Sequence, residues 1–297
     1  MKEVPRIEGP PRAALEELGA AVVHLEGSSA DASASPWSFA EGLFGERVVM
    51  VERQPIRAVP GGRTFASSAG FTPLHTDSQT HFGVPASAQV LVCRRPAERG
   101  GESTLVDAWQ LVAAVAEQDP ELSARLFDEV RALRFYFGDV VGATVSRRRG
   151  HLFFTHAPSP PPGDATAARI QSWVDRAPRA LVRIDAGDVL VVNNHRMLHG
   201  RLAFDGASRE LVRLLVWLEP PWRAPDAIAR RAREHETPAD PAASRRLAVV
   251  LELLRGSPPG VLAAREKIPE AELYRWRDAA LAGAGRALDE ALPPDRR

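Results

Sequence analysis

The chain has 297 residues, of which 44% are apolar, and its 38 basic side chains balance its 38 acidic ones. This length suffices for a large core, or for one domain with an appendage. A net charge of zero provides no overall field to attract nucleic acid or an acidic membrane surface. No stretch approaches the ~18 apolar residues of a membrane-spanning helix. The N-terminal residues lack the apolar core of a secretory signal.

Cys93 is the single cysteine of the chain. One cysteine excludes an internal disulfide and fits a reducing compartment, so a cytoplasmic location is expected. Cys93 lies in the apolar run over residues 88–93. We therefore expect it to be a core residue and not a reactive thiol.

The first hundred residues predict strands separated by loops and short helices. Ser35 and Pro36 are typical of a helix start, with serine as the cap and proline in the first turn. Helices are expected over residues 11–18 and 36–45. Strands are expected over residues 21–25, 47–52 and 88–94. Loops are expected over residues 27–35 and 58–72.

The next part of the chain, to residue 221, continues this alternation. Asp107 is expected to cap the helix that follows it. Helices are expected over residues 108–117, 120–133 and 166–177. Strands are expected over residues 134–137, 151–155, 182–184, 189–192 and 210–218. Strands throughout the chain with helices packed outside favour a mainly β fold, a cupin-like double-stranded β-helix or jelly roll with a pocket at its mouth.

Two segments about 120 residues apart carry metal-ligand chemistry. One is His75-Thr76-Asp77, and the other is the run Asn193-Asn194-His195-Arg196-Met197-Leu198-His199-Gly200. On an extended strand, residues i and i+2 point to the same face, so His75 and Asp77 can reach one metal. A second histidine must come from elsewhere, and a late strand can supply it. Two imidazoles and one carboxylate form the ligand set of a non-haem Fe(II) site with open positions.

The surroundings of these segments make the pattern specific. Residues 100–108 read Gly-Gly-Glu-Ser-Thr-Leu-Val-Asp-Ala, and Arg209 and Arg213 follow the second segment. In this order the motifs resemble the TauD/TfdA-type family of Fe(II)- and 2-oxoglutarate-dependent dioxygenases, and they are closest to the gamma-butyrobetaine hydroxylase branch. The resemblance covers roughly residues 15–220. It implies that O2 and 2-oxoglutarate are consumed, that succinate and CO2 are released, and that an unactivated C–H bond of a small molecule is hydroxylated.

The resemblance assigns roles residue by residue. It implies that His75, Asp77 and His199 bind the iron, since the family's last ligand is the histidine directly before Gly-Arg. His195 remains the rival for the third place, because it would face the same side of a strand. Arg209 is implied to bind the distal carboxylate of 2-oxoglutarate through its guanidinium fork. Thr104 is implied to donate a hydrogen bond to the same carboxylate.

The remaining assignments concern the substrate. Arg213, on the same strand face as Arg209, is expected to bind a substrate acid or the cosubstrate, with a salt bridge at the pocket rim as the alternative. Asn194 is expected either to support the turn before His199 or to contact the substrate. The residues expected to line the pocket or its lid are Phe71, Gln79, His81 and Phe82. Asp77 predicts hydroxylation, because the family's halogenases carry a small residue there.

The substrate itself is expected to be an amino acid or a natural-product intermediate, free or bound to a carrier protein. The sequence offers no cage of several aromatic residues for a trimethylammonium group. The resemblance to gamma-butyrobetaine hydroxylases therefore does not carry their substrate over to this chain.

From residue 222 the strand pattern ends, which predicts domains at 1–221 and 222–297, the second being all α. Helices are expected over residues 223–235, 242–255, 259–266 and 270–282. The last three resemble the helix-turn-helix of transposase-like proteins, although Lys267-Ile268-Pro269 replaces the usual glycine turn. Residues 222–297 hold 14 basic and 12 acidic residues, a net of +2, whereas DNA-binding modules are much more basic on one face. We therefore expect these helices to pack on the barrel or to form a homo-oligomer.

Two other classes of function remain open at this point. In one, the helical tail binds nucleic acid and the barrel is an oxygenase that acts on it. In the other, the barrel is a non-catalytic, cupin-like binding protein. The full ligand set together with Arg209 favours an enzyme over both.

Overall fold

The computed structural model describes residues 3–25, 28–77, 80–81, 83–135, 138–158, 161–206, 208–234, 241–254 and 257–291. The chain forms two compact units, Met1–Glu236 and Thr237–Arg297. The sequence placed a boundary after residue 221, but helix α7 (Asp226–Glu234) belongs to the first unit. Its Ile228 and Ala232 are buried in the core of that unit. None of the helices in the described ranges has the length and hydropathy needed to cross a membrane.

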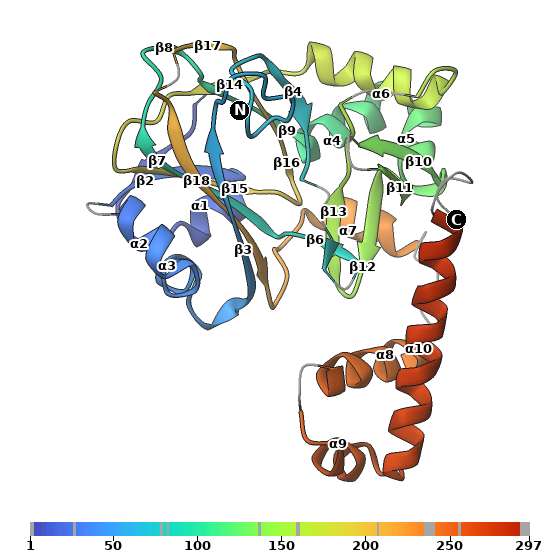
Figure 1. The fold of residues 1–297 in the computed structure, drawn as a ribbon. Helices are drawn as coiled ribbons and strands as arrows, with labels where there is room; N and C mark the ends of the chain where they lie inside the picture. The colour runs from blue at the N-terminus through green and yellow to red at the C-terminus, as the bar shows by residue number, and fades with distance from the viewer. Residues whose placement is uncertain are drawn as a thin grey trace. The chain divides into compact units, whose positions relative to one another are not determined.

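Two facing β-sheets form the centre of the first unit (Figure 1). The larger sheet has six strands, in the order β1 (Arg6–Ile7), β2 (Ala20–His24), β15 (Asp188–Asn193), β7 (Ala88–Arg95), β18 (Glu210–Leu218) and β3 (Val48–Arg57). The smaller sheet has four, in the order β14 (Ala180–Val182), β9 (Ser103–Asp107), β16 (Met197–Arg201) and β4 (Thr72–His75). The other strands form two-stranded sheets. β10 (Arg131–Phe135) pairs with β11 (Gly138–Gly142), and β12 (Val145–Arg148) pairs with β13 (His151–Phe154). β17 (Phe204–Asp205) pairs with β8 (Arg99–Gly100), and β5 (Thr80–His81) pairs with β6 (Val84–Pro85).

Alternation along the strands divides the apolar side chains between the two faces of each sheet. In β15, Val189 and Val191 pack on the outer face, whereas Leu190 and Val192 pack between the sheets. Cys93 of β7 also lies between the sheets, where burial raises the pKa of its thiol to about 11. The buried position agrees with its expected role as a core residue.

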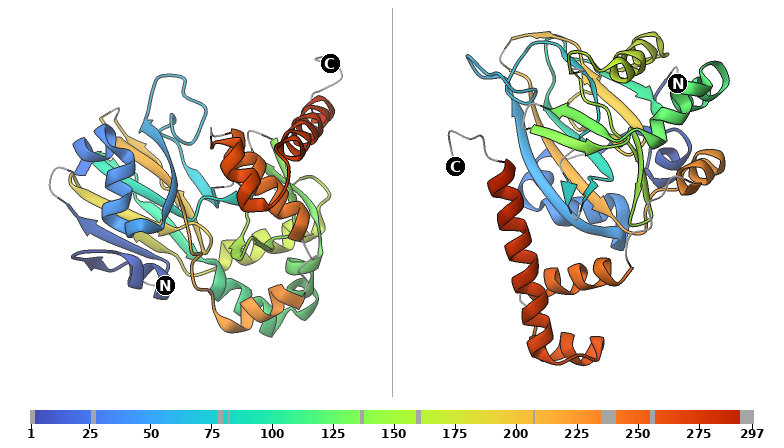
Figure 2. Two further views of the ribbon diagram at one scale, coloured as in Figure 1. Left: turned by 90° about the horizontal axis from the view of Figure 1, so that it is seen from below. Right: turned by 90° about the vertical axis from the view of Figure 1, so that its right-hand side faces the viewer.

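Helices cover the outer faces of both sheets (Figures 1 and 2). The outer face of the larger sheet is covered by α1 (Arg12–Glu17), α2 (Ser28–Ala34) and α3 (Pro36–Phe44), which is followed by a 3-10 turn at Gly45–Arg47. The smaller sheet is covered by α4 (Ala108–Gln118), α5 (Pro120–Asp128), α6 (Ala165–Arg176) and α7. The strand residues Val106 and Leu198 share one core with helix residues such as Leu122 and Ile170. The space between the sheets is thus left for the functional side chains.

Most predicted elements occur within a few residues of their expected bounds, and two differ in kind. Residues 27–35 were expected as a loop, but α2 begins at Ser28 and fully buries Ala32. The helix expected over residues 120–133 ends at Asp128, and β10 begins at Arg131. Leu133 and Phe135 of β10 are buried whereas Arg134 is exposed, a strand alternation that outweighs helix propensity.

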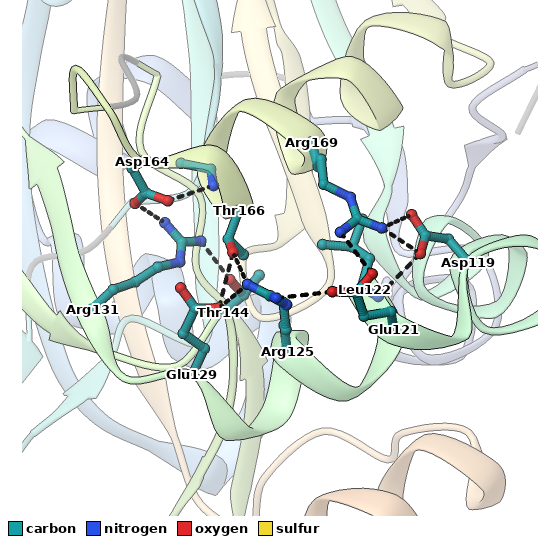
Figure 3. A network of polar contacts seen from close by, with 11 residues as sticks. Asp119, Glu121, Leu122, Arg125, Glu129, Arg131, Thr144, Asp164, Thr166 and Arg169 are labelled. Carbon is teal, nitrogen blue, oxygen red and sulfur yellow. Dashed lines mark hydrogen bonds and ion pairs between the residues drawn. The ribbon is translucent and has the colours of Figure 1, made fainter.

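The N-terminal ends of α5 and α6 are fixed by carboxylates shared with arginines (Figure 3). Asp119 accepts from the Leu122 amide at 3.1 Å and from Arg169 at 2.7 and 2.8 Å. Asp164 accepts from the Ala167 amide at 2.7 Å and from Arg131 at 3.2 Å. An N-cap bond satisfies one of the free amides of the first helical turn, and ion pairs at such a partly exposed surface add little stability. The network therefore mainly sets the position of these helices on the smaller sheet.

The second unit is a small helical module made of α8 (Pro241–Leu254), α9 (Pro259–Glu266) and α10 (Glu270–Ala291). Its core residues include Val249, Leu262 and Leu273. The turn after α9 places Lys267 at a φ of 56°, a left-handed conformation that more often belongs to glycine. The resemblance of these helices to a helix-turn-helix stays a prediction.

Trp222 joins the segment after β18 to the core, and this contact can be tested. Its indole nitrogen donates to the Ser87 carbonyl at 2.7 Å, its ring lies under the Arg47 guanidinium, and it is 6% exposed. We expect Trp222→Ala to reduce the free energy of unfolding by about 3–5 kcal/mol, the usual cost for a buried aromatic. Trp37, 44% exposed on α3, is the matched control. Trp37→Ala should cost no more than about 1 kcal/mol in the same denaturant titration, and equal losses would contradict the anchoring role.

Candidate metal centre and cavity

The smaller sheet brings three possible metal ligands together. His75, Asp77 and His199 each offer one ligand atom, these atoms lie within 4.8 Å of one another, and all three residues are buried. The arrangement follows from the antiparallel pairing of β4 with β16, in which His199 is the direct partner of His75. Asp77 follows two residues later and points to the same side, as the sequence pattern predicted. No other group of this kind lies among the described residues.

His75 is held in the tautomer that a metal ligand needs. Its Nδ1 lies 2.9 Å from the Pro73 carbonyl oxygen, which can only accept, so Nδ1 carries the hydrogen. The lone pair of Nε2 is then free to point towards Asp77 and His199. Burial, reinforced by the neighbouring His199, lowers the pKa of His75 to about 3, which keeps the ring neutral at physiological pH.

Asp77 is charged although it is buried. Burial alone would raise the pKa of its carboxyl, but Arg213 and then the two histidines lower it, and the net pKa lies well below its usual range. Arg213 donates to Asp77 Oδ1 at 2.9 Å, and its other terminal nitrogen donates to Gln54 Oε1. The buried ion pair therefore fixes both the charge and the orientation of the carboxylate.

Gln89 of β7 contacts two of the three candidate ligands. Its Nε2 lies 2.6 Å from Asp77 Oδ2 and 3.0 Å from His199 Nε2.

The side chain of Asn194 holds the main chain of Asp77. Its Oδ1 accepts from the Asp77 amide at 2.9 Å, and its Nδ2 donates to the Asp77 carbonyl at 2.9 Å. Asn194 also donates to the Ala86 carbonyl, and it is not among the residues that line the cavity. These contacts fit the supporting role that the sequence offered for Asn194, and its contact with substrate stays a prediction.

His195, the rival third ligand, lies elsewhere. Its Nε2 donates to the Pro85 carbonyl at 2.9 Å, and its ring packs against His151 and Phe153. Burial lowers the pKa of His195 to about 3, so the ring is a neutral core group. The turn over residues 193–196 separates this histidine from the inner face of β16, so that only His199 meets His75 and Asp77.

A cavity opens beside the three candidate ligands, between the two sheets. Its apolar walls are formed by Ile56, Phe65, Leu91, Leu105, Leu190 and Val192. Its polar groups come from Gln89, Ser103, Arg201, Arg209 and Arg213. A largely apolar cavity with a few convergent polar groups is typical of a small-molecule site.

Arg209 carries a buried positive charge, and its guanidinium lies 5.2 Å from the centre of the Phe204 ring. It is 5% exposed, and among the described residues no hydrogen bond or ion pair is made by its guanidinium. Burial, and to a smaller extent the charge of Arg201, lowers the pKa of Arg209 to about 10, so it stays protonated at neutral pH. A Cβ on Gly101, whose φ is +77°, would lie 3.3 Å from Arg209 Nε, so the glycine leaves room for the guanidinium.

Thr104 does not line the cavity, contrary to its predicted role. The strand alternation of β9 turns Ser103 and Leu105 inward and Thr104 outward. Thr104 pairs with Gly200, and its hydroxyl fills the space where a Cβ on that glycine would be, 2.7 Å away. The hydroxyl available beside Arg209 in the cavity is therefore that of Ser103, which lies next to Thr104 in the same motif.

Of the residues predicted to line the pocket or its lid, Phe71 is 58% exposed at the surface and is not part of the cavity wall. Phe65 of the same loop lines the cavity, and its ring centre lies 5.0 Å from that of His75. Gln79, Phe82 and the side chain of His81 lie outside the described residues. The prediction for these three is thus not addressed by the structure.

Arg201 links the metal-binding strand to this loop. Its guanidinium donates to the carbonyl oxygens of Phe65, Ser68 and Gly70 at 3.2, 2.8 and 2.5 Å. These bonds direct main-chain dipoles at the two terminal nitrogens of a buried cation and hold Phe65 against the cavity. Arg201 was not predicted as a site residue, although its place directly after the His199-Gly200 pair was a signal that it shares their strand.

A family model matches most of this unit. It is the model of the family described as taurine catabolism dioxygenase TauD, TfdA family, and it matches residues 22–215, which is more than half of the chain. The match spans the candidate ligands, Ser103, Arg209 and Arg213. It ends before the C-terminal helices, so it carries no information on them.

Several solved structures have a similar fold. Asparagine oxygenase in complex with Fe(II), 2S,3S-3-hydroxyasparagine and succinate has a TM-score of 0.54 at 17% identity, and the match covers 69% of this chain and 77% of that chain. The PvcB protein from Pseudomonas aeruginosa has a TM-score of 0.53 at 18% identity, with coverages of 76% and 90%. The non-heme iron oxygenase OrfP, in complex with Fe, succinate and (3S)-hydroxy-L-Arg, has a TM-score of 0.52 at 14% identity, with coverages of 77% and 82%. At these identities the likeness shows the fold, and the predicted jelly roll with flanking helices is confirmed.

The choice between the two histidines of residues 195–199 can be tested directly. We expect His199→Gln to weaken metal binding by more than about a hundredfold, since loss of a group outside the ligands already costs about 10–100-fold. His195→Gln keeps a donor for the Pro85 carbonyl and should leave metal affinity within about threefold, because the ring does not reach the other ligands. Equilibrium titration with Mn(II) measures both variants. Loss of binding in the His195 variant alone would assign the third ligand to His195.

Proposed function

The chain belongs to the taurine catabolism dioxygenase TauD, TfdA family, and we propose that its Fe(II) is bound by His75, Asp77 and His199. It is a 2-oxoglutarate-dependent dioxygenase that hydroxylates an unactivated C–H bond of a small molecule and releases succinate and CO2. The observation that carries the residue assignment is the convergence of the three donor groups within 4.8 Å at one end of a largely apolar cavity.

The donor set fits the metal. Two neutral imidazoles and one carboxylate suit Fe(II), and three protein ligands leave positions for 2-oxoglutarate and O2. When bound, Fe(II) supplies the oxidative chemistry that removes hydrogen from the substrate. The protein residues hold Asp77 ionised, keep His75 in one tautomer, and exclude water through apolar walls.

Arg209 and Ser103 are proposed to bind the distal carboxylate of 2-oxoglutarate. A buried guanidinium that pairs with no carboxylate in the described part of the chain favours an anionic ligand, and its planar fork matches a carboxylate. The Ser103 hydroxyl lines the same cavity and can donate a further hydrogen bond. The charge of Arg209 persists at neutral pH because its pKa remains near 10.

Arg213 is proposed to support Asp77 and, from the same place, to contact the substrate or cosubstrate. One of its terminal nitrogens donates to Asp77 and the other to Gln54, and its side chain lines the cavity. An amino acid is the substrate class we favour. This choice is supported by the asparagine oxygenase and OrfP structures, whose bound products are hydroxylated amino acids.

The C-terminal helices are proposed to mediate self-association in the cytoplasm and not specific binding of nucleic acid. Leu247 and Leu254 on α8 are exposed, and so are Tyr274 and Leu281 on α10. Each pair is seven residues apart and so shares one side of its helix. Light scattering of the full chain tests the association, and a gel shift with duplex DNA tests the alternative.

The function is tested with a panel of free amino acids and carrier-bound derivatives under Fe(II), 2-oxoglutarate and O2. Succinate formation coupled to a product heavier by one oxygen atom is the expected result for at least one substrate. Absence of succinate release, with and without every substrate, in protein loaded with Fe(II) would contradict the assignment of an active oxygenase.

The role of Arg209 predicts a specific defect. Arg209→Gln should raise the concentration of 2-oxoglutarate needed for half-saturation by about tenfold to a hundredfold, because bonds to a charged group contribute roughly 1.5–3 kcal/mol each. Metal affinity should change by less than about threefold, since Arg209 does not contact the ligands. Calorimetric titration of 2-oxoglutarate into the Mn(II)-loaded protein measures the loss. An unchanged 2-oxoglutarate affinity would remove Arg209 from the site.

The opposite faces of β9 allow a matched pair of hydroxyl deletions. Ser103→Ala should weaken 2-oxoglutarate binding by about tenfold, the scale of one hydrogen bond to a carboxylate. Thr104→Val also deletes only a hydroxyl, but on the outer face, so it should change the 2-oxoglutarate affinity by less than about twofold. The same calorimetric titration compares them, and the reverse order would restore Thr104 as the cosubstrate ligand.

A further inference from the structure

Gln89 bridges Asp77 and His199 from the opposite sheet. It lies on the inner face of β7, is 3% exposed, and its amide group stands 2.6 Å from Asp77 Oδ2 and 3.0 Å from His199 Nε2. The ionised Asp77 carboxylate can only accept hydrogen bonds, so the amide atom beside it is the nitrogen. That nitrogen has two hydrogens, and the second is directed at the lone pair of His199 Nε2.

The Gln89 amide nitrogen makes the contacts that a cation would make. It lies between Asp77 Oδ2 and His199 Nε2, which are 3.6 Å apart, and donates a hydrogen bond to each. The other oxygen of Asp77 is taken by Arg213. The Oδ2 atom of Asp77 and the Nε2 atom of His199 therefore need neither a proton nor a metal to be satisfied in the buried site.

We propose that Gln89 is a positioning residue that holds Asp77 and His199 in their coordinating arrangement before metal binding, and that the metal displaces its amide nitrogen from His199. The proposal rests on the proposed function, in which these two residues bind Fe(II). Displacement follows from the single lone pair of His199 Nε2, which cannot accept a hydrogen and coordinate a metal at the same time. The Gln89–His199 hydrogen bond therefore belongs to the metal-free state alone.

A contact present only without metal opposes metal binding by its own free energy. Gln89→Leu removes that contact and also the hydrogen bond to Asp77 Oδ2, while keeping an unbranched Cβ and a similar volume. The bond to Asp77 can persist in the metal-loaded protein, so both forms of the variant should be less stable than the wild type. The metal-free form should lose more stability, because it alone also loses the contact with His199. By the thermodynamic cycle, the variant should bind metal more tightly, by about fivefold for one ordinary hydrogen bond.

Co(II) is a suitable probe because its visible absorption reports the ligands without turnover. The dissociation constant of Co(II) and the melting temperatures of the metal-free and Co(II)-loaded proteins are measured for the wild type, Gln89→Leu and Ser87→Ala. Ser87 is the matched control, since its buried hydroxyl accepts from the Leu218 amide at 3.2 Å and touches no ligand. Ser87→Ala should lower both melting temperatures equally and leave Co(II) affinity unchanged.

Two results for Gln89→Leu would overturn the proposal. Equal destabilisation of both forms with unchanged affinity would make Gln89 an ordinary support of the strand. Weaker Co(II) binding would mean that the amide is needed in the metal-bound site. Failure of the wild type itself to bind Co(II) would instead contradict the proposed function.

Gln89→Glu is the second variant, and it covers the case in which the leucine variant does not fold. It places a carboxylate of nearly the same shape where the amide stands now. If the Gln89 amide occupies the position of the cation, the carboxylate of the variant becomes an additional charged ligand. Co(II) should then bind more than about tenfold tighter, and its visible spectrum should change. Unchanged affinity and spectrum would show that residue 89 does not reach the cation position, and the proposal would fail.

Discussion

The site depends on one constraint, which is that charged side chains buried between the two sheets need partners. Asp77, Arg201, Arg209 and Arg213 are all buried or nearly so, and an unpaired charge in such a place is costly. Arg213 compensates Asp77, and three main-chain carbonyls compensate Arg201. Of these four charges in the described residues, that of Arg209 has no such compensation. One charge thus stays open in the cavity that His75 and His199 also line.

The placement of His75 and Asp77 was predictable because it depends on local pattern, whereas His199 was preferred to His195 through the resemblance to the family. His75 and Asp77 share a face through strand periodicity alone, and the Asp107 cap of α4 forms as expected, with its carboxylate accepting from the Trp109 amide at 3.0 Å. Thr104 shows where this reasoning ends. A shift of one residue turns a strand side chain to the other face, and only the pairing of β9 with β16 reveals that Ser103 faces inward.

Contacts between distant segments could not be read from the sequence. Gln89 reaches Asp77 and His199 because β7 of the larger sheet faces β16 of the smaller one, across the inner space of the barrel. Asn194 looks like a residue of the metal motif, yet its amide holds the main chain of Asp77. In both cases the residue type was visible, but its partner was set by tertiary packing.

The separation of faces also explains how one small barrel combines rigidity with a reactive interior. Outward side chains such as Val191 and Leu198 pack under helices, whereas inward ones carry the chemistry. The guanidinium groups of Arg201, Arg209 and Arg213 line the cavity, and Asp77 pairs with Arg213, so positive charge is in excess among the described side chains there. A dicarboxylate cosubstrate carries the opposite charge and can neutralise this excess. Because the helices and outer faces hold the strands in place without it, the cavity can remain charged and open until that ligand arrives.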